Sequence, residues 1–94
     1  MEEKVRKHYD KTRELRKKTQ EEVRKLKEEN PCKDCGRHYP FYVMQFDHLD
    51  PSQKSFMIGS SCQKYSRKRI FEEIDKCELV CANCHAIRTF LRRI

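Results

Sequence analysis

The chain has 94 residues, of which 36% are hydrophobic, and it carries six cysteines and a formal net charge of +7. A chain this short forms one small domain and buries too little apolar surface to offset its conformational entropy. We therefore expect an additional stabilising cross-link, here called a staple. Apolar runs of only a few residues exclude a membrane-spanning helix. Because no apolar N-terminal stretch is typical of a secretory signal, we expect a cytoplasmic protein, whose thiols stay reduced.

The excess of basic residues favours a polyanionic partner, because each Lys or Arg placed on a phosphate releases condensed counterions. Nucleic acid is the first candidate among such partners. The alternative is that the charge only solvates the surface. The net charge therefore indicates a function only together with a specific site.

Residues 1–30 predict one long helix, since the segment is rich in strong helix formers and contains neither Gly nor Pro. Its apolar positions are too sparse for a coiled-coil seam. The segment is then either a solvated arm or a basic arm that lies along a DNA backbone. The Asn30-Pro31 pair ends the helix. We therefore divide the chain into a basic helical arm at residues 1–30 and a compact domain at residues 31–94.

The first part of the compact domain predicts a β-hairpin. Residues 41–47 alternate and are rich in aromatic and β-branched side chains, which is typical of a strand. Asp50-Pro51-Ser52-Gln53 has the chemistry of a turn, and residues 54–58 read as the returning strand. A polar loop is expected at residues 59–65.

Two helices are expected after this loop. Residues 67–76 carry Ile70, Phe71 and Ile74 on one helical face, and Ser66 is a suitable N-cap. Residues 82–94 form the last helix. The expected fold class is therefore small α+β.

Two CxxC pairs are the strongest signal in the sequence. Cys32 and Cys35 are followed directly by Gly36, which permits the positive φ that such turns often need, and Cys81 and Cys84 form the second pair. Four thiolates from two short knuckles suit one tetrahedral zinc ion, which we predict to be structural because no coordination position stays open. The alternative is a disulfide or redox pair.

Two cysteines remain outside these pairs. Cys77 lies close to Leu79 and Val80, so we expect a buried free thiol. Cys62 lies in the polar loop, where an exposed thiol is expected, and no role follows from its position.

Asp47-His48 at the predicted strand end and His85 after the second knuckle form a candidate catalytic set. The zinc would bring the strand end and the helix start together. Phosphodiester hydrolysis needs a base that deprotonates water and a divalent ion that stabilises the developing charge. Taken singly, each of the three residues is as readily a surface or packing residue.

The stretch 32–90 contains the motifs CKDCG, FDHLDP, KSF, KC and CANCHAIRTF in this order. It resembles the HNH endonucleases of bacteriophages and bacteria, in particular short members with FDH and CANCH signatures. The resemblance implies a zinc-stapled ββα-metal core, a hairpin plus a helix, behind a long N-terminal helix. It further implies a metal-dependent DNA endonuclease or nickase in a bacterial or phage-infected cell.

The resemblance also implies roles for individual residues. His48 matches the general base, and Asp47 and His85 match the ligands of a catalytic Mg²⁺, Mn²⁺ or other divalent ion. Cys32, Cys35, Cys81 and Cys84 match structural zinc ligands.

Two positions depart from the family pattern. The middle Asn has no counterpart between His48 and the second knuckle, within which Asn83 lies. Ala86 stands where related sequences tend to have Arg after the closing His, and Arg88 can supply that charge.

Helix geometry places Arg88, Thr89 and Arg92 on the face of His85, which we expect to meet phosphate. Ile87, Leu91 and Ile94 share another face, which we expect to meet the core. A second basic cluster lies around the start of the helix at residues 67–76, where a solvated helix start is the alternative. The predicted nucleic-acid contacts are Arg88, Arg92, Lys54, Arg67, Lys68 and Arg69.

Three functional readings follow. The first is the metal-dependent nuclease, acting as a monomer or homodimer. The second is a non-catalytic zinc-containing DNA-binding module, for example a subunit that works with phage packaging proteins. The third, a zinc module for protein interaction, explains neither the candidate catalytic set nor the charge. Plasmid nicking with Mg²⁺ or Mn²⁺ separates the first reading from the second.

Overall fold

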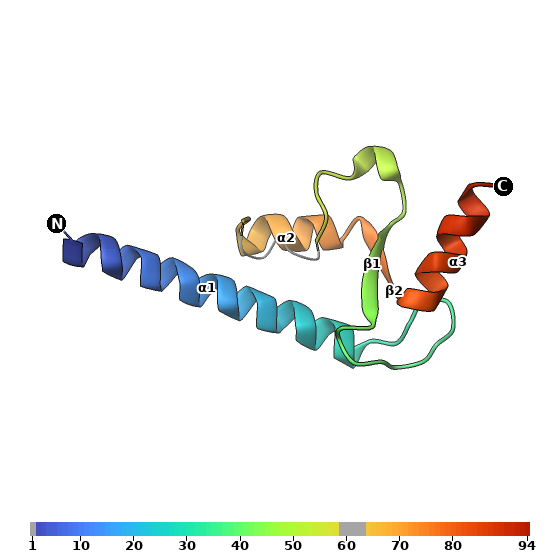
Figure 1. Cartoon of the computed structure of the whole chain (residues 1–94), viewed down its shortest axis with the longest axis horizontal. Helices are drawn as coiled ribbons and strands as arrows, with labels where there is room; N and C mark the ends of the chain where they lie inside the picture. Colours follow the sequence, from blue (N-terminus) through green and yellow to red (C-terminus); the bar gives the residue numbers. More distant parts are fainter. Residues whose placement is uncertain (1, 59–63) are drawn as a thin grey trace.

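The computed structural model describes residues 2–58 and 64–94 (Figure 1). In this part of the chain, three α-helices and a two-stranded antiparallel sheet form a small α+β fold, as expected. The elements in chain order are α1 (Glu2–Glu29), β1 (Met44–His48), a 3-10 turn (Pro51–Gln53), α2 (Arg67–Ile74), β2 (Cys77–Cys81) and α3 (Ala82–Arg92).

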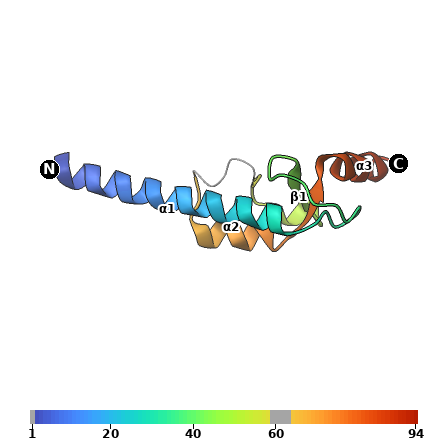
Figure 2. The same cartoon turned by 90° about the horizontal axis from the view of Figure 1, so that it is seen from below.

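The long first helix is confirmed, but it is not a free arm along its whole length. Thr19 and Val23 are buried, and Val23 joins Ile70 of α2 in one core cluster. Leu15, one turn before Thr19, is 61% exposed. Figures 1 and 2 show α2 beside the second half of α1, whereas the first half of α1 extends away from the rest. The last turns of α1 therefore belong to the compact unit.

The partner of β1 is β2, and not the segment at residues 54–58. Met44 pairs with Cys81 and His48 with Cys77 at the two ends of the antiparallel register. The prediction of a returning strand at residues 54–58 is therefore wrong. The physical reason is that its backbone donors are used elsewhere, because Lys54 N–H donates to the Pro51 carbonyl and Ser55 N–H to the Glu73 carboxylate.

The predicted turn after β1 is a short 3-10 helix. Asp50 caps it, since its carboxylate accepts from the backbone N–H and the hydroxyl of Ser52. The loop predicted at residues 59–65 falls mostly at 59–63, which lie outside the described residues.

The helix predicted at residues 67–76 is confirmed as α2, although it ends at Ile74. The Ser66 hydroxyl accepts from Arg69 N–H at the N-cap. Ile70 is fully buried, and Phe71 and Ile74 pack against the same cluster. The apolar face read from the sequence is therefore the face that meets α1.

Helix α3 follows β2 without a linker, because Cys81 is both the last strand residue and the helix N-cap. The prediction that the apolar face of this helix packs against the core is wrong. Ile87, Leu91 and Ile94 are 56%, 60% and 87% exposed. The opposite, charged face turns toward Asp47 of β1 instead. A buried carboxylate requires cationic partners, so the charged face of α3 lies inward.

A second core cluster contains Cys32, Met44, Val80 and Cys81, which joins the knuckles to the sheet. The two clusters are small, as expected for a chain of this length. None of the described helices is long and apolar enough to span a membrane.

Candidate functional site

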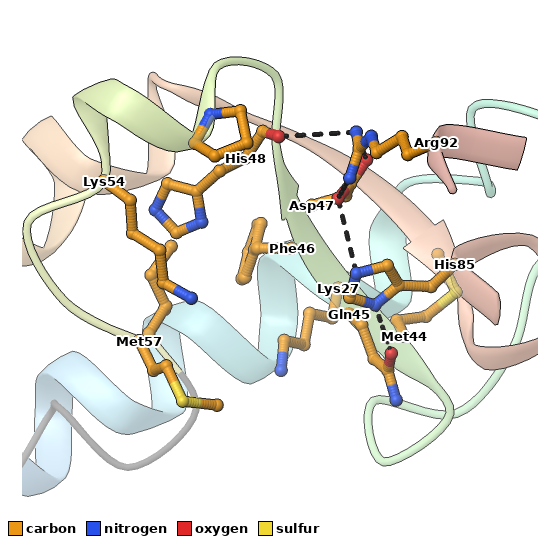
Figure 3. Close-up of a pocket in the computed structure, with 12 residues that line it drawn as sticks. Lys27, Met44, Gln45, Phe46, Asp47, His48, Lys54, Met57, His85 and Arg92 are labelled. Atoms are coloured by element: carbon orange, nitrogen blue, oxygen red, sulfur yellow. Dashed lines mark hydrogen bonds and ion pairs between the residues drawn. The ribbon is translucent and has the colours of Figure 1, made fainter. Parts of the chain in front are cut away.

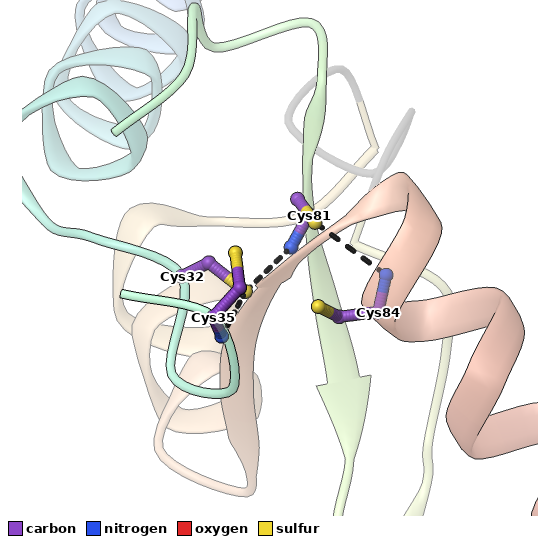
Figure 4. A group of neighbouring side chains, drawn as sticks. All are labelled: Cys32, Cys35, Cys81 and Cys84. Carbon is purple, nitrogen blue, oxygen red and sulfur yellow. Dashed lines mark hydrogen bonds between the residues drawn. The ribbon is translucent and has the colours of Figure 1, made fainter. Parts of the chain in front are cut away.

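The four CxxC cysteines converge in one place, as their spacing predicts (Figure 4). Their sulfur atoms all lie within 4.8 Å of one another. Four thiolates on a tetrahedral zinc lie roughly 3.8 Å apart, given bonds of about 2.3 Å. The cluster can therefore hold a metal ion with little rearrangement.

Local backbone geometry builds this cluster. Gly36 has a φ of 75° and closes the first knuckle. Cys32 Sγ accepts from the N–H groups of Cys35 and Cys81, and Cys81 Sγ accepts from Cys84 N–H. These donors stabilise negative charge on sulfur, which is what a metal ligand must carry.

The thiol pKa values reflect this arrangement. Burial raises the pKa of Cys32, but the backbone N–H groups of Cys35, Cys81 and Asp34 lower it to about 6. The hydrogen bond with Cys81, together with burial, raises the pKa of Cys84 to about 12. Four crowded sulfur atoms resist full ionisation by themselves, and a divalent cation removes that repulsion.

Cys77 lies outside the cluster. Its thiol is half-buried and lies 3.4 Å from the Glu73 carbonyl oxygen, to which it donates. Burial, with the negative charges of Glu73 and Asp47, raises the pKa of Cys77 to about 11. Cys77 is therefore a free thiol that is half-buried, where the sequence predicted a buried one, and its raised pKa disfavours the reactive thiolate. Cys62 lies outside the described residues.

A cavity of about 450 Å³ runs along the free edge of β1 and receives all three residues of the candidate catalytic set (Figure 3). Figure 3 shows Asp47 and His48 on opposite sides of the strand, with His85 beside Asp47. The polar and charged lining residues are Lys27, Gln45, Asp47, His48, Lys54, His85 and Arg92. The last turns of α1 therefore contribute Lys27 to this pocket, which the sequence interpretation did not foresee.

Asp47 and His85 face each other at the right-hand side of this pocket. Asp47 is 3% exposed, and His85 Nε2 lies 3.3 Å from Asp47 Oδ1. The other ring nitrogen of His85, Nδ1, lies 2.6 Å from the side-chain oxygen of Gln45. An amide oxygen only accepts, so Nδ1 carries a proton, and Nε2 is the ring nitrogen that faces the Asp47 carboxylate. The sequence interpretation did not name Gln45. Strand alternation, which places Gln45 and Asp47 on one face, could have indicated that Gln45 belongs to this site.

Two arginines of α3 hold Asp47. Arg92 makes a bidentate contact at 2.9 and 2.7 Å, and Arg88 approaches at 2.9 Å. Although burial raises the pKa of Asp47, hydrogen bonds from Arg92 and then Arg88 keep it below its ordinary value of 3.8. Arg88 also pairs with Asp34 and Glu78, so it is held on three sides.

His48 contacts a carboxylate that the sequence interpretation missed. Its Nε2 atom lies 2.7 Å from Glu73 Oε2, and the two side chains are 9% and 2% exposed. Glu73 also accepts from Ser55 N–H and Lys76 Nζ. Although burial raises the pKa of Glu73, the hydrogen bonds from Lys76, Ser55 and His48 lower it from 4.5 to about 2. The sequence offered one signal for this contact. Glu73 directly precedes Ile74 and lies on the apolar side of α2, where an acidic residue needs a partner.

The remaining predicted nucleic-acid contacts lie in two places. Lys54 is exposed and lines the pocket. Arg67, Lys68 and Arg69 lie at the start of α2, the end remote from the sheet (Figure 1). Arg67 pairs with Glu22 of α1 at 2.7 Å. The structure therefore separates this basic cluster from the pocket.

The chain was also compared with family models, curated proteins and solved structures, and none of the three comparisons found a match. Its function is therefore inferred from its residues and their geometry.

Proposed function

We propose that this chain is a metal-dependent DNA endonuclease or nickase of the HNH class, with His48 as the general base. One observation carries the proposal. The adjacent residues Asp47 and His48 and the distant His85 line one pocket. A base and two candidate ligands in one pocket are what metal-assisted phosphodiester hydrolysis needs. In this proposal β1, β2 and α3 are the ββα-metal core.

Asp47 and His85 would hold the catalytic divalent ion. Two adjacent ligands of one such ion lie roughly 3 Å apart, given bonds of about 2.1 Å. The separation of 3.3 Å between Asp47 Oδ1 and His85 Nε2 fits this requirement, and because Gln45 occupies Nδ1, Nε2 is the ring nitrogen that would bind the ion. The bound ion supplies positive charge that stabilises the phosphate and the leaving oxygen.

His48 takes the proton of the attacking water in this proposal. A neutral imidazole is an effective base near neutral pH. Lys27 and Lys54 line the same pocket, where their ammonium groups attract the DNA backbone. Arg92, whose side chain is 43% exposed, can exchange Asp47 for a phosphate oxygen.

The four-cysteine cluster is proposed to bind structural zinc. A closed set of four thiolates leaves no position for substrate, so the ion supports the fold. It would tie the loop after α1 to the junction of β2 and α3, from which His85 projects. The basic first half of α1 is proposed to lie along the DNA backbone.

The alternative is a non-catalytic zinc-containing DNA-binding module that works with phage packaging proteins. A specific observation favours it, because Arg88 and Arg92 already satisfy Asp47. In that reading Asp47 anchors α3 to the sheet and binds no ion. The net charge supports DNA binding in both readings.

A plasmid-nicking assay with and without added Mg²⁺ or Mn²⁺ tests the proposal. Replacing His48 by Ala should lower the cleavage rate by about 100-fold or more, while DNA affinity stays nearly unchanged. His38→Ala is the matched control, because His38 is exposed and lies outside the pocket. If wild type cleaves with no divalent ion tested, or His48→Ala cleaves like wild type, the binding-module reading replaces the nuclease.

A further inference from the structure

Glu73 is the buried carboxylate that the proposed mechanism does not yet use. It sits on α2 with 2% of its side chain exposed, and three groups contact its two oxygens when the His48 ring is included. Oε1 accepts from Lys76 Nζ at 2.9 Å. Oε2 accepts from Ser55 N–H at 3.0 Å and contacts His48 Nε2 at 2.7 Å. A buried charge requires such partners, and Lys76 balances it.

The contact with His48 fixes which ring nitrogen carries a proton. An ionised carboxylate only accepts hydrogen bonds, so Nε2 of His48 is the protonated nitrogen. In the neutral ring that a general base requires, the other nitrogen, Nδ1, then keeps its lone pair. An imidazole without such a partner exchanges between two tautomers and rotates about its side-chain bonds, and only one of these states presents a base at a given point.

We propose that Glu73 is a positioning residue that orients the His48 ring and makes Nδ1 the atom that receives the proton of water. This role rests on the proposed function of His48 as the general base. Lys76 and Ser55 hold the carboxylate in place, so the orientation of His48 is set by α2 rather than by the strand that carries it. The competing explanation is that Glu73 only anchors residues 49–58 through Ser55 and Lys76.

The variant Glu73→Gln separates the two explanations. The ammonium group of Lys76 is the charged and stronger donor, so it should retain the amide oxygen, and the NH₂ group then takes the Oε2 position at the loss of the hydrogen bond from Ser55 N–H. The NH₂ group then faces His48 Nε2 and donates to it, which moves the imidazole proton to Nδ1. The shape of the side chain is preserved, but the wrong tautomer is selected.

The expected kinetic result is a fall in kcat of about 100-fold, with KM for DNA changed less than about twofold. Glu72→Gln is the matched control, because Glu72 is the exposed neighbour on the same helix, and it should cleave like wild type. In a His48→Ala background, Glu73→Gln should cause no further loss, since both substitutions remove the same base. If the two losses multiply, Glu73 acts only as an anchor and the inference is wrong.

A second measurement does not depend on cleavage. Nitrogen-15 NMR of the histidine rings reports which nitrogen of His48 is protonated. We expect the proton on Nε2 in wild type and in Glu72→Gln, and on Nδ1 in Glu73→Gln. A proton on Nδ1 in wild type, or the same tautomer in all three proteins, overturns the inference whether or not DNA is cut. If wild type never cleaves but the tautomers behave as expected, the proposed function fails and the positioning of His48 by Glu73 stands.

Discussion

The four-cysteine cluster and the pocket along the free edge of β1 meet at the first turn of α3. This turn supplies Cys84 to the cluster and His85 to the pocket. In the cluster, backbone N–H groups stabilise the sulfur atoms, and the sulfurs already lie within 4.8 Å of one another. In the pocket, other charged side chains satisfy the functional groups. Arg92 holds Asp47, and Glu73 holds His48.

This difference has a consequence for metal binding. A cation that enters the cluster displaces only protons, so its binding energy stabilises the fold directly. A cation that binds Asp47 must compete with Arg92 for the same oxygens. The first site should therefore bind metal without DNA, whereas the second should bind it better when a phosphate takes Arg92 away.

The largest effect is expected at the cluster. Cys81→Ser removes a thiolate whose backbone and sulfur both hold the knuckles together, so we expect loss of bound zinc and of the cooperative fold. Structural zinc sites contribute on the order of 10 kcal/mol in small domains. Zinc content and circular dichroism measure the result. Cys77→Ser should keep one zinc per chain and the fold, and loss of zinc from that control would contradict the four-cysteine assignment.

The pocket should respond differently when its two candidate ligands are changed. Asp47→Asn and His85→Ala should both slow cleavage by about 100-fold and both raise the Mn²⁺ concentration needed for it. Only Asp47→Asn should also destabilise the fold, by roughly 2–3 kcal/mol, because Arg88 and Arg92 lose a buried partner. Urea unfolding measures the difference. An unchanged metal requirement in both variants would favour the binding-module reading.

The buried Glu73 carboxylate, which contacts His48, should make stability depend on pH. The folded-state pKa of Glu73, about 2, lies below its ordinary value of 4.5, so folding favours the ionised form. Its contribution, on the order of 3 kcal/mol, is complete above about pH 4.5 and is lost as the pH falls toward 2. Wild type should therefore exceed Glu73→Gln in unfolding free energy at pH 7, and the gap should shrink in acid. If Glu72→Gln lowers the unfolding free energy at pH 7 by the same amount, the buried carboxylate of Glu73 is not the cause of the difference.

The smallest effect is expected from the helical arm. Deleting residues 1–18 leaves Thr19 and Val23 in place, so the fold should persist, while DNA affinity falls about tenfold at low salt. The salt dependence of binding should become flatter, because fewer counterions are released. Deleting residues 1–30 should also destabilise the fold, since Val23 packs on Ile70. If the shorter chain and wild type bind DNA with equal affinity at every salt concentration, the arm does not contact DNA.

Some features follow from the sequence alone because their causes are local. The CxxC spacing brings each cysteine pair together within one turn, and Ser66 caps α2 with a donor three residues away. The uninterrupted helix formers of α1 require no partner to be recognised. These features depend on neighbours in the chain, which the sequence displays directly.

Other features were decided only by the tertiary structure. The partner of β1, the inward face of α3 and the contact of Glu73 with His48 each join residues far apart in the chain. Residues 54–58 have a strand-like pattern, but Glu73 takes a backbone donor that a strand would need. The apolar pattern of α3 placed Ile87 inward, but Asp47 attracts the arginines of the opposite face. In both cases a buried carboxylate outweighs local propensity, because leaving it without donors costs more than exposing an apolar side chain.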